Sequence, residues 1–377
     1  MDQLSPVDPG SLRVLVTHDW LVTWAGAERV LSEIMKVVPQ ADLVVAVRTP
    51  DLAARNEIAA RARETWVGRL PFARSRHRWF MPLHYEAFSG LDTRDYDLVI
   101  SSSHAFAKAV RAAPGTPHVC YCHSPPRYLW DMGAQYREQS NALAAGALRV
   151  GTPLLRALDR RSATGVTHFV SNSRFVAERI AAAYGRNATV VNPPVEPKPS
   201  PRRGREDFLL VLGRLVAYKR VDLAIQAAER LGIRLVVAGE GRERRKLERL
   251  AGSHTKFLGE VDEATAGDLM ERCRAFVFCA EEDFGIAPVE ANAHGAPVIG
   301  YARGGLMETM VQGTTAELFQ RQTVDDLTRA IAAAQARSWD EAAIRRNAER
   351  YTAARFRESF SSVLRAAVSE ARRAETP

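Results

Sequence analysis

The sequence predicts an α/β protein built from two Rossmann-like, doubly wound domains. Short apolar runs alternate with helical patterns in the first half, the same alternation restarts in the second half, and a proline-rich stretch lies between them. Apolar runs of this kind are typical of parallel strands covered on both faces, and an alternating β/α series builds a doubly wound sheet. A chain of 377 residues also exceeds the usual size of a single core.

The first domain is expected to span residues 1–192. Its first strand, over 12–17, ends at His18-Asp19-Trp20, and a loop with Gly26 leads to a helix over 27–38, where apolar residues recur at helical spacing. Further strands are expected at 43–47, 98–101, 118–121 and 168–170. Ser173 is a suitable N-cap for a helix over 174–184.

A linker is expected over 193–207, because five prolines fall between residues 192 and 201 and so many cannot belong to a helix or a central strand. The second domain, 208–352, then repeats the pattern. Its strands are predicted at 208–212, 234–238, 275–279 and 298–300, and its helices at 220–231 and 242–251. The tail from 324 to 374 reads as helical, and we expect residues 353–377 to form a C-terminal helix that can cross back to the first domain.

The composition indicates a globular protein, with 46% hydrophobic and 25% charged residues. The net charge of +8, from 52 basic minus 44 acidic residues, suits a phosphate-bearing ligand or an anionic surface. We expect no nucleic-acid binding, because the arginines cluster without a recognition motif. No apolar run reaches the roughly 20 residues that span a bilayer, and the first eleven residues lack a signal-like apolar core, so a cytoplasmic location is expected. The cysteines lack zinc-site spacing and are expected to be buried thiols: Cys120, Cys122, Cys273 and Cys279.

An acidic element follows the strand predicted to end at Cys279. It reads Glu282-Asp-Phe-Gly-Ile-Ala-Pro-Val-Glu290, in which Gly285 allows a tight turn and Pro288 suits the first turn of a helix. Glu282 should therefore lie in the loop and Glu290 early in the helix. Two carboxylates so placed can accept hydrogen bonds from hydroxyls at two ends of one ligand, such as a sugar and a ribose. An ordinary acidic loop with a glutamate at a helix dipole is the alternative.

A basic element lies at the start of the second domain. Gly213, Arg214 and Lys219 are expected between a strand end and a helix start, where two cations and backbone amides can bind a diphosphate. Positive charge at that position stabilises a departing phosphate without a metal. A solvated basic turn is the alternative interpretation. It is less favoured because the acidic element lies in the same domain.

Together these motifs resemble retaining glycosyltransferase family 4. Glu282 and Glu290 match its E-x7-E spacing, and Gly213-Arg214-Leu215 with Lys219 looks like its G-R-L-x-x-x-K. Gly239-Glu240-Gly241 is similar to its G-x-G turn, and Phe257-Leu258-Gly259 to the segment near the base. The run Cys122-His123-Ser124-Pro125-Pro126-Arg127 and the run from Asp97 to Lys108 resemble a narrower branch, which includes mannosyltransferases of O-antigen and exopolysaccharide assembly.

The resemblance implies the GT-B fold, with two Rossmann-like domains facing across a cleft, and no metal or other cofactor. It implies that His123 lies near the donor sugar, that Arg214 and Lys219 hold the diphosphate, that Glu290 binds the ribose and that Glu282 binds the sugar hydroxyls. Donor-binding positions implied in addition are Gly26, Gly213, Gly239, Gly241, Leu258, Phe284, Gly285 and Ile286. One departure is that the first loop reads Ala25-Gly26, where the family commonly has two glycines.

The resemblance favours a hexosyltransferase that uses GDP-mannose, with a UDP-sugar as another donor, and a glycan or lipid-linked acceptor. We expect retention by departure and attack on the same face, with the phosphate helping to deprotonate the acceptor and His123 orienting the sugar. A nucleotide-sugar epimerase and a sugar-nucleotide-binding scaffold without turnover are the alternatives. The segment 61–80 holds six arginines interleaved with aromatic residues. Such a segment can contact an anionic membrane at the inner face or form a solvated acceptor-side loop.

Overall fold

The structure, a computed structural model, describes residues 9–130, 142–196 and 204–375, so residues 197–203 of the expected linker lie outside the described part. The chain divides into two compact units. Unit 1 comprises Met1–Asn192 and Phe356–Pro377, and unit 2 comprises Pro193–Arg355. Val195 is buried in the core of unit 2 and its amide donates to the carbonyl of Tyr351 at 2.6 Å, so the chain joins unit 2 well before the first strand of that unit.

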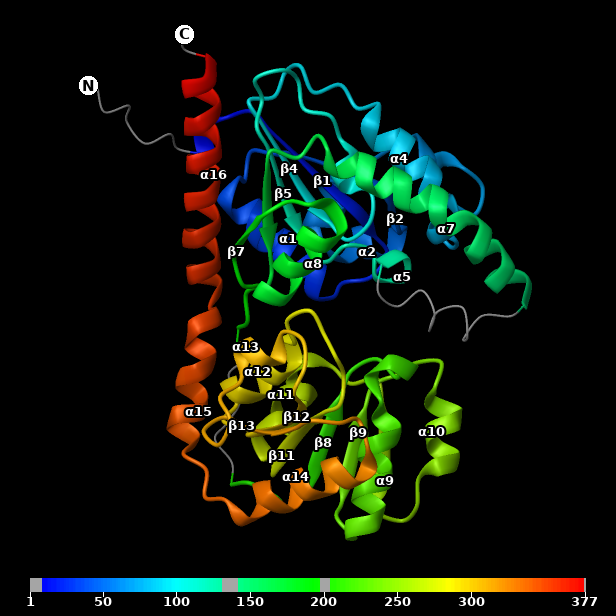
Figure 1. The fold of residues 1–377 in the computed structure, drawn as a ribbon, viewed down its shortest axis with the longest axis vertical. Helices are drawn as coiled ribbons and strands as arrows, with labels where there is room; N and C mark the ends of the chain where they lie inside the picture. Colours follow the sequence, from blue (N-terminus) through cyan, green and yellow to red (C-terminus); the bar gives the residue numbers. More distant parts are fainter. Residues whose placement is uncertain (1–8, 131–141, 197–203, 376–377) are drawn as a thin grey trace. The chain divides into compact units, whose positions relative to one another are not determined.

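Unit 1 contains a parallel sheet of seven strands with the order β3-β2-β1-β4-β5-β6-β7 (Figure 1). The strands in that order are Arg63–Glu64, Asp42–Arg48, Val14–Leu21, Leu98–Ser103, His118–Cys122, His168–Ser171 and Ala188–Val190. Helices α1 (Gly26–Val37) and α16 (Ala353–Glu375) cover one face, and α4 (Met81–Ser89), α7 (Ala142–Ala163) and α8 (Arg174–Tyr184) cover the other. Short helices α2 (Pro50–Arg55), α3 (Glu57–Arg61) and α5 (Arg127–Trp130) complete the unit.

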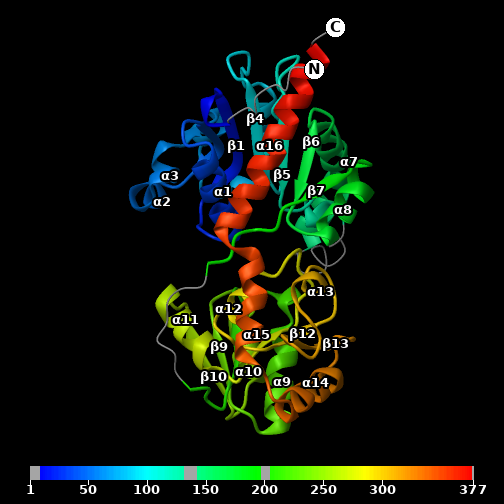
Figure 2. The same ribbon diagram turned by 90° about the vertical axis from the view of Figure 1, so that its left-hand side faces the viewer.

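Helix α16 packs on the sheet of unit 1, as Figure 2 shows. Its buried residues Phe356, Phe360, Leu364, Ala367 and Val368 recur every three or four positions, which gives the helix one apolar face. Arg357 of α16 pairs with Glu33 of α1. The C-terminal segment therefore belongs to the core of unit 1, although the residues just before it belong to unit 2.

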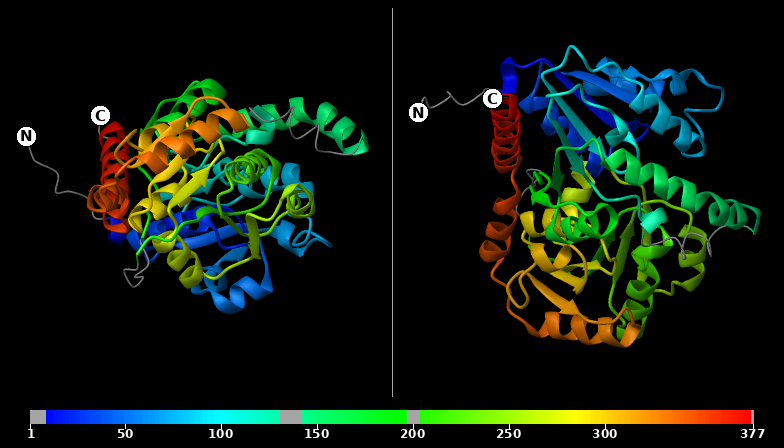
Figure 3. Two further views of the ribbon diagram at one scale, coloured as in Figure 1. Left: turned by 90° about the horizontal axis from the view of Figure 1, so that it is seen from below. Right: turned by 45° about the horizontal axis from the view of Figure 1, so that its top comes forward.

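Unit 2 contains a parallel sheet of six strands with the order β10-β9-β8-β11-β12-β13. Figure 1 labels β8, β9, β11, β12 and β13, and Figure 3 shows the unit from two further sides. The strands in that order are Thr255–Gly259, Leu235–Ala238, Leu209–Leu212, Ala275–Phe278, Val298–Tyr301 and Ala316–Phe319. Helices α9 (Val221–Leu231), α10 (Arg244–Leu250) and α14 (Val324–Ala336) cover one face, and α11 (Glu263–Arg272), α12 (Ile286–Ala293) and α13 (Leu306–Thr309) cover the other. Helix α15 (Glu341–Ala348) packs against α12.

Both sheets have the doubly wound order with a switch point, which confirms the predicted fold class. The switch lies between β1 and β4 in unit 1 and between β8 and β11 in unit 2, where neighbouring strands lead to helices on opposite faces. Ligands of such sheets bind beyond the carboxyl ends of the strands at this point. The residues that end these four strands are therefore where a site is sought.

Most predicted elements are confirmed to within a few residues, and three differences have a physical reason. Strand β1 runs on through His18, Asp19 and Trp20, which are buried, whereas the sequence placed them at its end because two of them are charged or polar. The helical tail is divided into three helices, α14, α15 and α16. Strands β3, β7, β10 and β13 were not predicted. Edge strands such as β10 alternate exposed and half-buried residues and lack a continuous apolar run.

All four cysteines are buried free thiols, as predicted. Among the helices of the described residues, none combines the length and the apolar character needed to cross a membrane.

Candidate functional site

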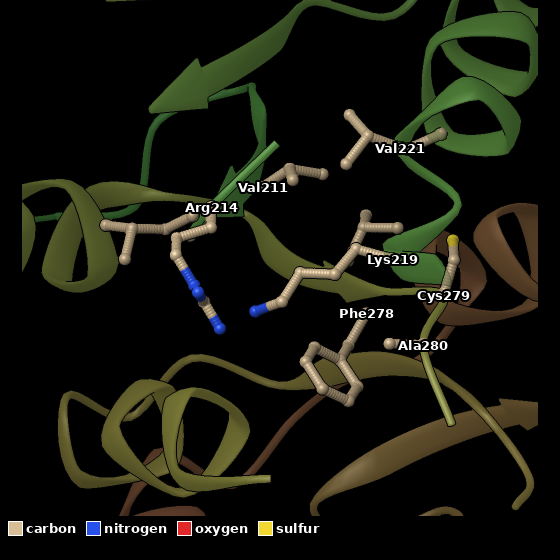
Figure 4. A pocket seen from close by; sticks show the side chains of 11 residues that line it. Val211, Arg214, Lys219, Val221, Phe278, Cys279 and Ala280 are labelled. Carbon is tan, nitrogen blue, oxygen red and sulfur yellow. The ribbon is translucent and has the colours of Figure 1, made fainter. Parts of the chain in front are cut away.

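A pocket opens in unit 2 at the switch point of its sheet, between the ends of β8 and β11 and the start of α9 (Figure 4). It is lined by Val211, Leu212, Gly213, Arg214, Lys219, Val221, Ala224, Val277, Phe278, Cys279 and Ala280. The base is apolar, and the two cations at the rim supply the charge. An apolar base with a few polar groups is the usual make-up of a small-molecule site.

Arg214 and Lys219 direct their nitrogen atoms into the same space (Figure 4). Arg214 is exposed, whereas the Lys219 side chain is 19% exposed. Gly213, with φ +141°, brings the chain close to Lys219, since a Cβ at this position would lie 3.1 Å from Nζ of Lys219. The structure thus brings the three residues of the predicted basic element together.

Lys219 also meets the first glutamate of the acidic element. Its Nζ lies 3.4 Å from Oε1 of Glu282, and the hydroxyl of Tyr218 donates to the same oxygen at 3.2 Å. Because Glu282 is only partly buried, with 25% of its side chain exposed, it can still accept hydrogen bonds from a ligand. The motifs at 213–219 and 282–290, more than sixty residues apart in sequence, therefore form one site.

The second glutamate lies in the following helix. Gly285, with φ +84°, is the N-cap of α12, and Glu290 is half-buried within that helix. Ile286 is the first residue of α12, so the amides of its first turn have no intrahelical acceptor. Phe284 is buried and packs edge-to-face on Tyr351 at 5.3 Å, so its ring serves the core and only its backbone can face a ligand.

Two glycines hold the basic loop against the loop after β9. A Cβ at Gly239 would lie 2.1 Å from the carbonyl oxygen of Gly213, and one at Gly241 would lie 2.1 Å from that of Leu215. Backbone hydrogen bonds from Gly213 to Ala238 and from Leu215 to Glu240, at 3.0 and 2.8 Å, fix the same contact. These glycines therefore position Arg214 by allowing close backbone approach. Leu258, near the end of the adjoining strand β10, is 36% exposed.

The sequence did not predict a second glycine pair, Gly304-Gly305, which supports the acidic loop. A Cβ at Gly304 would lie 2.3 Å from the carbonyl oxygen of Glu282, and one at Gly305 would lie 2.4 Å from that of Asp283. Arg220 was also missed: it adopts φ +49° before α9 and pairs with Asp222 at 3.0 Å. The two adjacent glycines lie just after a predicted strand, so the sequence did contain a signal for a close backbone approach there. Nothing in the sequence indicates the left-handed backbone conformation of Arg220.

In unit 1, Gly26 and His123 lie at the carboxyl ends of strands. Gly26 is the first residue of α1, and the Glu28 carboxylate accepts a hydrogen bond from the amide of Ala25 at 2.9 Å. His123 follows β5, and its Nε2 lies 2.8 Å from the hydroxyl of Ser102. Burial lowers the pKa of His123 to about 3, so its imidazole is neutral near pH 7.

Four further histidines, three of them around Trp20, were not predicted as a group. His104 and His77 pack on the Trp20 ring at centroid distances of 4.6 and 4.7 Å, and burial lowers the pKa of His77 to about 4. Asp19, fully buried, accepts hydrogen bonds from four consecutive amides of the loop after β4, at 2.6 to 2.9 Å. His18 and His84 complete the group. No periodicity in the sequence links these residues, because they come from β1, the turn before α4, α4 itself and the loop after β4.

The segment 61–80 folds into short helical turns rather than one open loop. Three of its arginines bind within the chain: Arg61 donates to the carbonyls of Pro39 and Ala41, Arg63 lies near Asp42, and Arg74 pairs with Glu64. The other three, Arg69, Arg76 and Arg78, are exposed. Phe72 and Trp79 are 73% and 74% exposed, with the Arg76 guanidinium 4.5 Å from the Trp79 ring centre.

Asp97, the second aspartate of an Asp95-x-Asp97 sequence, lies immediately before β4 and is paired with Arg13. Asp97 accepts hydrogen bonds from the backbone and side chain of Arg13, at 2.9 and 3.2 Å, which ties the start of β1 to the start of β4. Within the described residues, no group of three or more metal-ligating side chains is found.

The two doubly wound domains have the GT-B fold, which is found in glycosyltransferases. Two glycosyltransferase family models match the chain in succession: Glycosyltransferase Family 4 over residues 24–198, and Glycosyl transferases group 1 over residues 194–351. The solved structure of HepE from Anabaena, with UDP and glucose, is similar with a TM-score of 0.69 and 18% identity over 94% of this chain and 99% of that one.

Curated relatives match over part of their length. A glycogen synthase of Mycobacterium tuberculosis is 36% identical over 30% of this chain and 30% of its own. A GDP-mannose-dependent alpha-(1-6)-phosphatidylinositol monomannoside mannosyltransferase of Mycolicibacterium smegmatis is 28% identical over 48% of this chain and 56% of its own. The chain thus spans about a third to a half of the length of these relatives.

Proposed function

We propose that this protein is a retaining glycosyltransferase that moves a hexose from a nucleotide-diphosphate donor to a glycan or lipid-linked acceptor. The observation that carries the proposal is the pocket in unit 2 that Arg214 and Lys219 line at the ends of β8 and β11, with Glu282 beside Lys219. Two cations beside a carboxylate suit a ligand that has a diphosphate next to a polyol. Two successive matches to glycosyltransferase family models support the same reaction class.

In the proposed reaction, Arg214 and Lys219 hold the diphosphate and stabilise its charge as the bond from the sugar C1 to the phosphate oxygen breaks. The acceptor oxygen forms the new bond to C1 on the same face, and its proton passes to the departing phosphate. Glu282 binds hydroxyls of the sugar and Glu290 those of the ribose, with the free amides of the 284–286 turn as further donors. Gly26 and His123 contribute from unit 1, and the chemistry requires neither a metal nor another cofactor.

GDP-mannose is the favoured donor. A mannosyltransferase that depends on GDP-mannose is among the relatives, whereas HepE was crystallised with UDP and glucose, so a UDP-sugar is the competing donor. The base is expected to lie toward Leu258 and the loop after β9. A screen of GDP-mannose, GDP, UDP-glucose and UDP by thermal unfolding separates these donors, since at equal concentration a ligand that binds more tightly raises the unfolding midpoint further.

We further propose that Arg69, Arg76, Arg78, Phe72 and Trp79 contact an anionic membrane at its cytoplasmic face. The three exposed arginines can attract negative lipid headgroups, and the two exposed aromatic rings beside them suit the interfacial layer of a membrane. Phe72 adopts φ +61°, a conformation that costs a non-glycine residue about 1–2 kcal/mol, and it exposes the ring. A lipid-linked acceptor would be met at this surface.

The proposal is tested by turnover of the stabilising sugar nucleotide with a lipid extract as acceptor. Release of nucleoside diphosphate together with a glycosylated lipid supports a transferase. Conversion of the donor into another sugar nucleotide without an acceptor would identify an epimerase instead, and binding without any conversion would identify a scaffold.

A further inference from the structure

A chain of buried polar groups runs from the start of α1 to the end of β5 in unit 1. Oε1 of Glu28 lies 3.8 Å from Nε2 of His18, and Nδ1 of His18 lies 3.0 Å from the hydroxyl of Ser102. That hydroxyl lies 2.8 Å from Nε2 of His123. His18 and Ser102 are fully buried and face each other across the pairing of β1 with β4, so water cannot take the place of either of them.

The proton on His18 can be assigned from its neighbours. Nδ1 of His18 also lies 3.1 Å from the backbone carbonyl oxygen of Ser102. A carbonyl oxygen only accepts hydrogen bonds, so Nδ1 of His18 carries a proton and donates it toward the carbonyl and the adjacent hydroxyl. The Ser102 hydroxyl oxygen therefore accepts a hydrogen bond from Nδ1 of His18, and the hydroxyl proton must point to another acceptor.

The remaining neighbour of the Ser102 hydroxyl is Nε2 of His123. If the hydroxyl donates there, Nε2 accepts, and the single proton of a neutral imidazole must sit on Nδ1. The opposite assignment would direct two N–H groups at one hydroxyl and leave the hydroxyl proton buried without an acceptor, which is costly. His123 is half-buried, and among the described residues its ring is hydrogen-bonded through Nε2 and not through Nδ1. The protonated nitrogen is the one left for a ligand.

We propose that Ser102 and His18 are positioning residues that hold His123 as the Nδ1–H tautomer, so that His123 acts as a hydrogen-bond donor to a ligand oxygen. The inference rests on the proposed function in that the ligand is the sugar of the donor. Its chemical content is new to that proposal: His123 cannot take up the acceptor proton, because its one free lone pair is already bound by Ser102. The ligand atom that matches this N–H group is an accepting oxygen of a hydroxyl or an ether.

The tautomer is tested directly by ¹⁵N NMR of the histidine-labelled full chain, with the His123 signals assigned from the His123→Asn variant. The wild type should show a protonated Nδ1 and a bare Nε2. Ser102→Ala should shift His123 toward protonated Nε2, since the donor to that nitrogen is gone. Ser103→Ala is the matched control, because Ser103 is the next residue of β4, is equally buried and has a hydroxyl without a partner among the described residues, so this variant should keep the wild-type tautomer. A wild type protonated at Nε2, or an unchanged tautomer in Ser102→Ala, overturns the proposal.

Kinetics give the second readout. Ser102→Ala should lower kcat about tenfold while changing the KM for the sugar nucleotide less than twofold, and Ser103→Ala should leave both within twofold. His123→Asn, whose amide can stand near the position of Nδ1, should retain at least five times the kcat of His123→Gln, whose amide lies near that of Nε2. Wild-type kcat in Ser102→Ala, or an equal or better His123→Gln, contradicts the positioning role. Should the protein transfer no sugar, the proposed function fails, and the NMR result still decides the tautomer.

Discussion

The ammonium of Lys219 and the carboxylate of Glu282 lie 3.4 Å apart and join the basic and acidic motifs into one site. Lys219 is thus held in place before any ligand arrives, and a diphosphate would find a cation whose orientation is already fixed. Pre-organised charge of this kind stabilises a leaving group without the cost of rearrangement during the reaction.

Removing either cation of the pocket should slow transfer. We expect Arg214→Ala and Lys219→Ala each to lower turnover by more than about tenfold, which corresponds to roughly 1.4 kcal/mol of lost transition-state stabilisation. Steady-state rates with the preferred donor measure the effect. Lys246→Ala on α10, an exposed lysine, should stay near wild type, and near-normal rates in both pocket variants would exclude the diphosphate role.

A methyl group at Gly241 should destabilise unit 2. The added Cβ would lie 2.1 Å from the carbonyl oxygen of Leu215, and neither backbone can withdraw because the two loops are hydrogen-bonded. We expect Gly241→Ala to lower the free energy of unfolding by about 2 kcal/mol or more, as measured by urea denaturation. Gly204→Ala, where a Cβ meets nothing within 4 Å, is the control. Equal stabilities of the two variants would show that the close approach of the loops does not exist in solution.

Unit 1 should lose stability as the pH falls from 7 to 5. Burial lowers the pKa of His118 to about 4, so between pH 4 and 6.5 the unfolded state binds the proton that the folded state excludes, and stability falls with falling pH. For one such histidine the loss at pH 5 is at most about 2 kcal/mol. His118→Gln should show a smaller difference in unfolding free energy between pH 7 and pH 5 than the wild type. An unchanged or larger difference would mean that His118 is not kept neutral by burial.

The exposed arginine–aromatic surface should bind anionic vesicles. Replacing Arg69, Arg76 and Arg78 by Ser should reduce partitioning onto phosphatidylglycerol vesicles about 100-fold, since each basic residue near such a surface contributes about 1 kcal/mol. Flotation at low and high salt measures it, and salt should weaken wild-type binding. Replacing the exposed Arg242, Arg245 and Arg249 of unit 2 removes the same charge and should have little effect. Equal flotation of both triple variants would contradict the membrane contact.

The fold could be predicted from the sequence because its central strands are continuous apolar runs. The runs that became β4, β8 and β11 are buried on both faces, and the helix at 174–184 was marked by Ser173, whose hydroxyl accepts from the amide of Val176 at 3.1 Å. Edge strands escaped prediction because their outer side chains face solvent. The division of the tail also escaped, since its charged, alanine-rich sequence suits helix throughout.

The pocket in unit 2 was predicted from residues within short motifs, where Gly213, Arg214 and Lys219 lie a few positions apart. The grouping of His18, Ser102 and His123 in unit 1 could not be predicted. His18 and Ser102 come from β1 and β4, His123 follows β5, and only the pairing of these strands brings the three together. Single polar residues inside apolar runs were more simply interpreted as strand ends or core residues. The sequence alone does not show which residues of distant strands lie side by side in the sheet.

Calorimetric titrations should compare the nucleoside diphosphate of the preferred donor with the corresponding monophosphate. The comparison decides whether unit 2 binds the diphosphate group. The wild type should bind the diphosphate at least about tenfold more tightly, or roughly 1.4 kcal/mol, and the Arg214→Ala/Lys219→Ala double variant should bind the two nucleotides alike. A wild type that does not distinguish them, or a double variant that keeps the full preference, would contradict the assignment of the pocket.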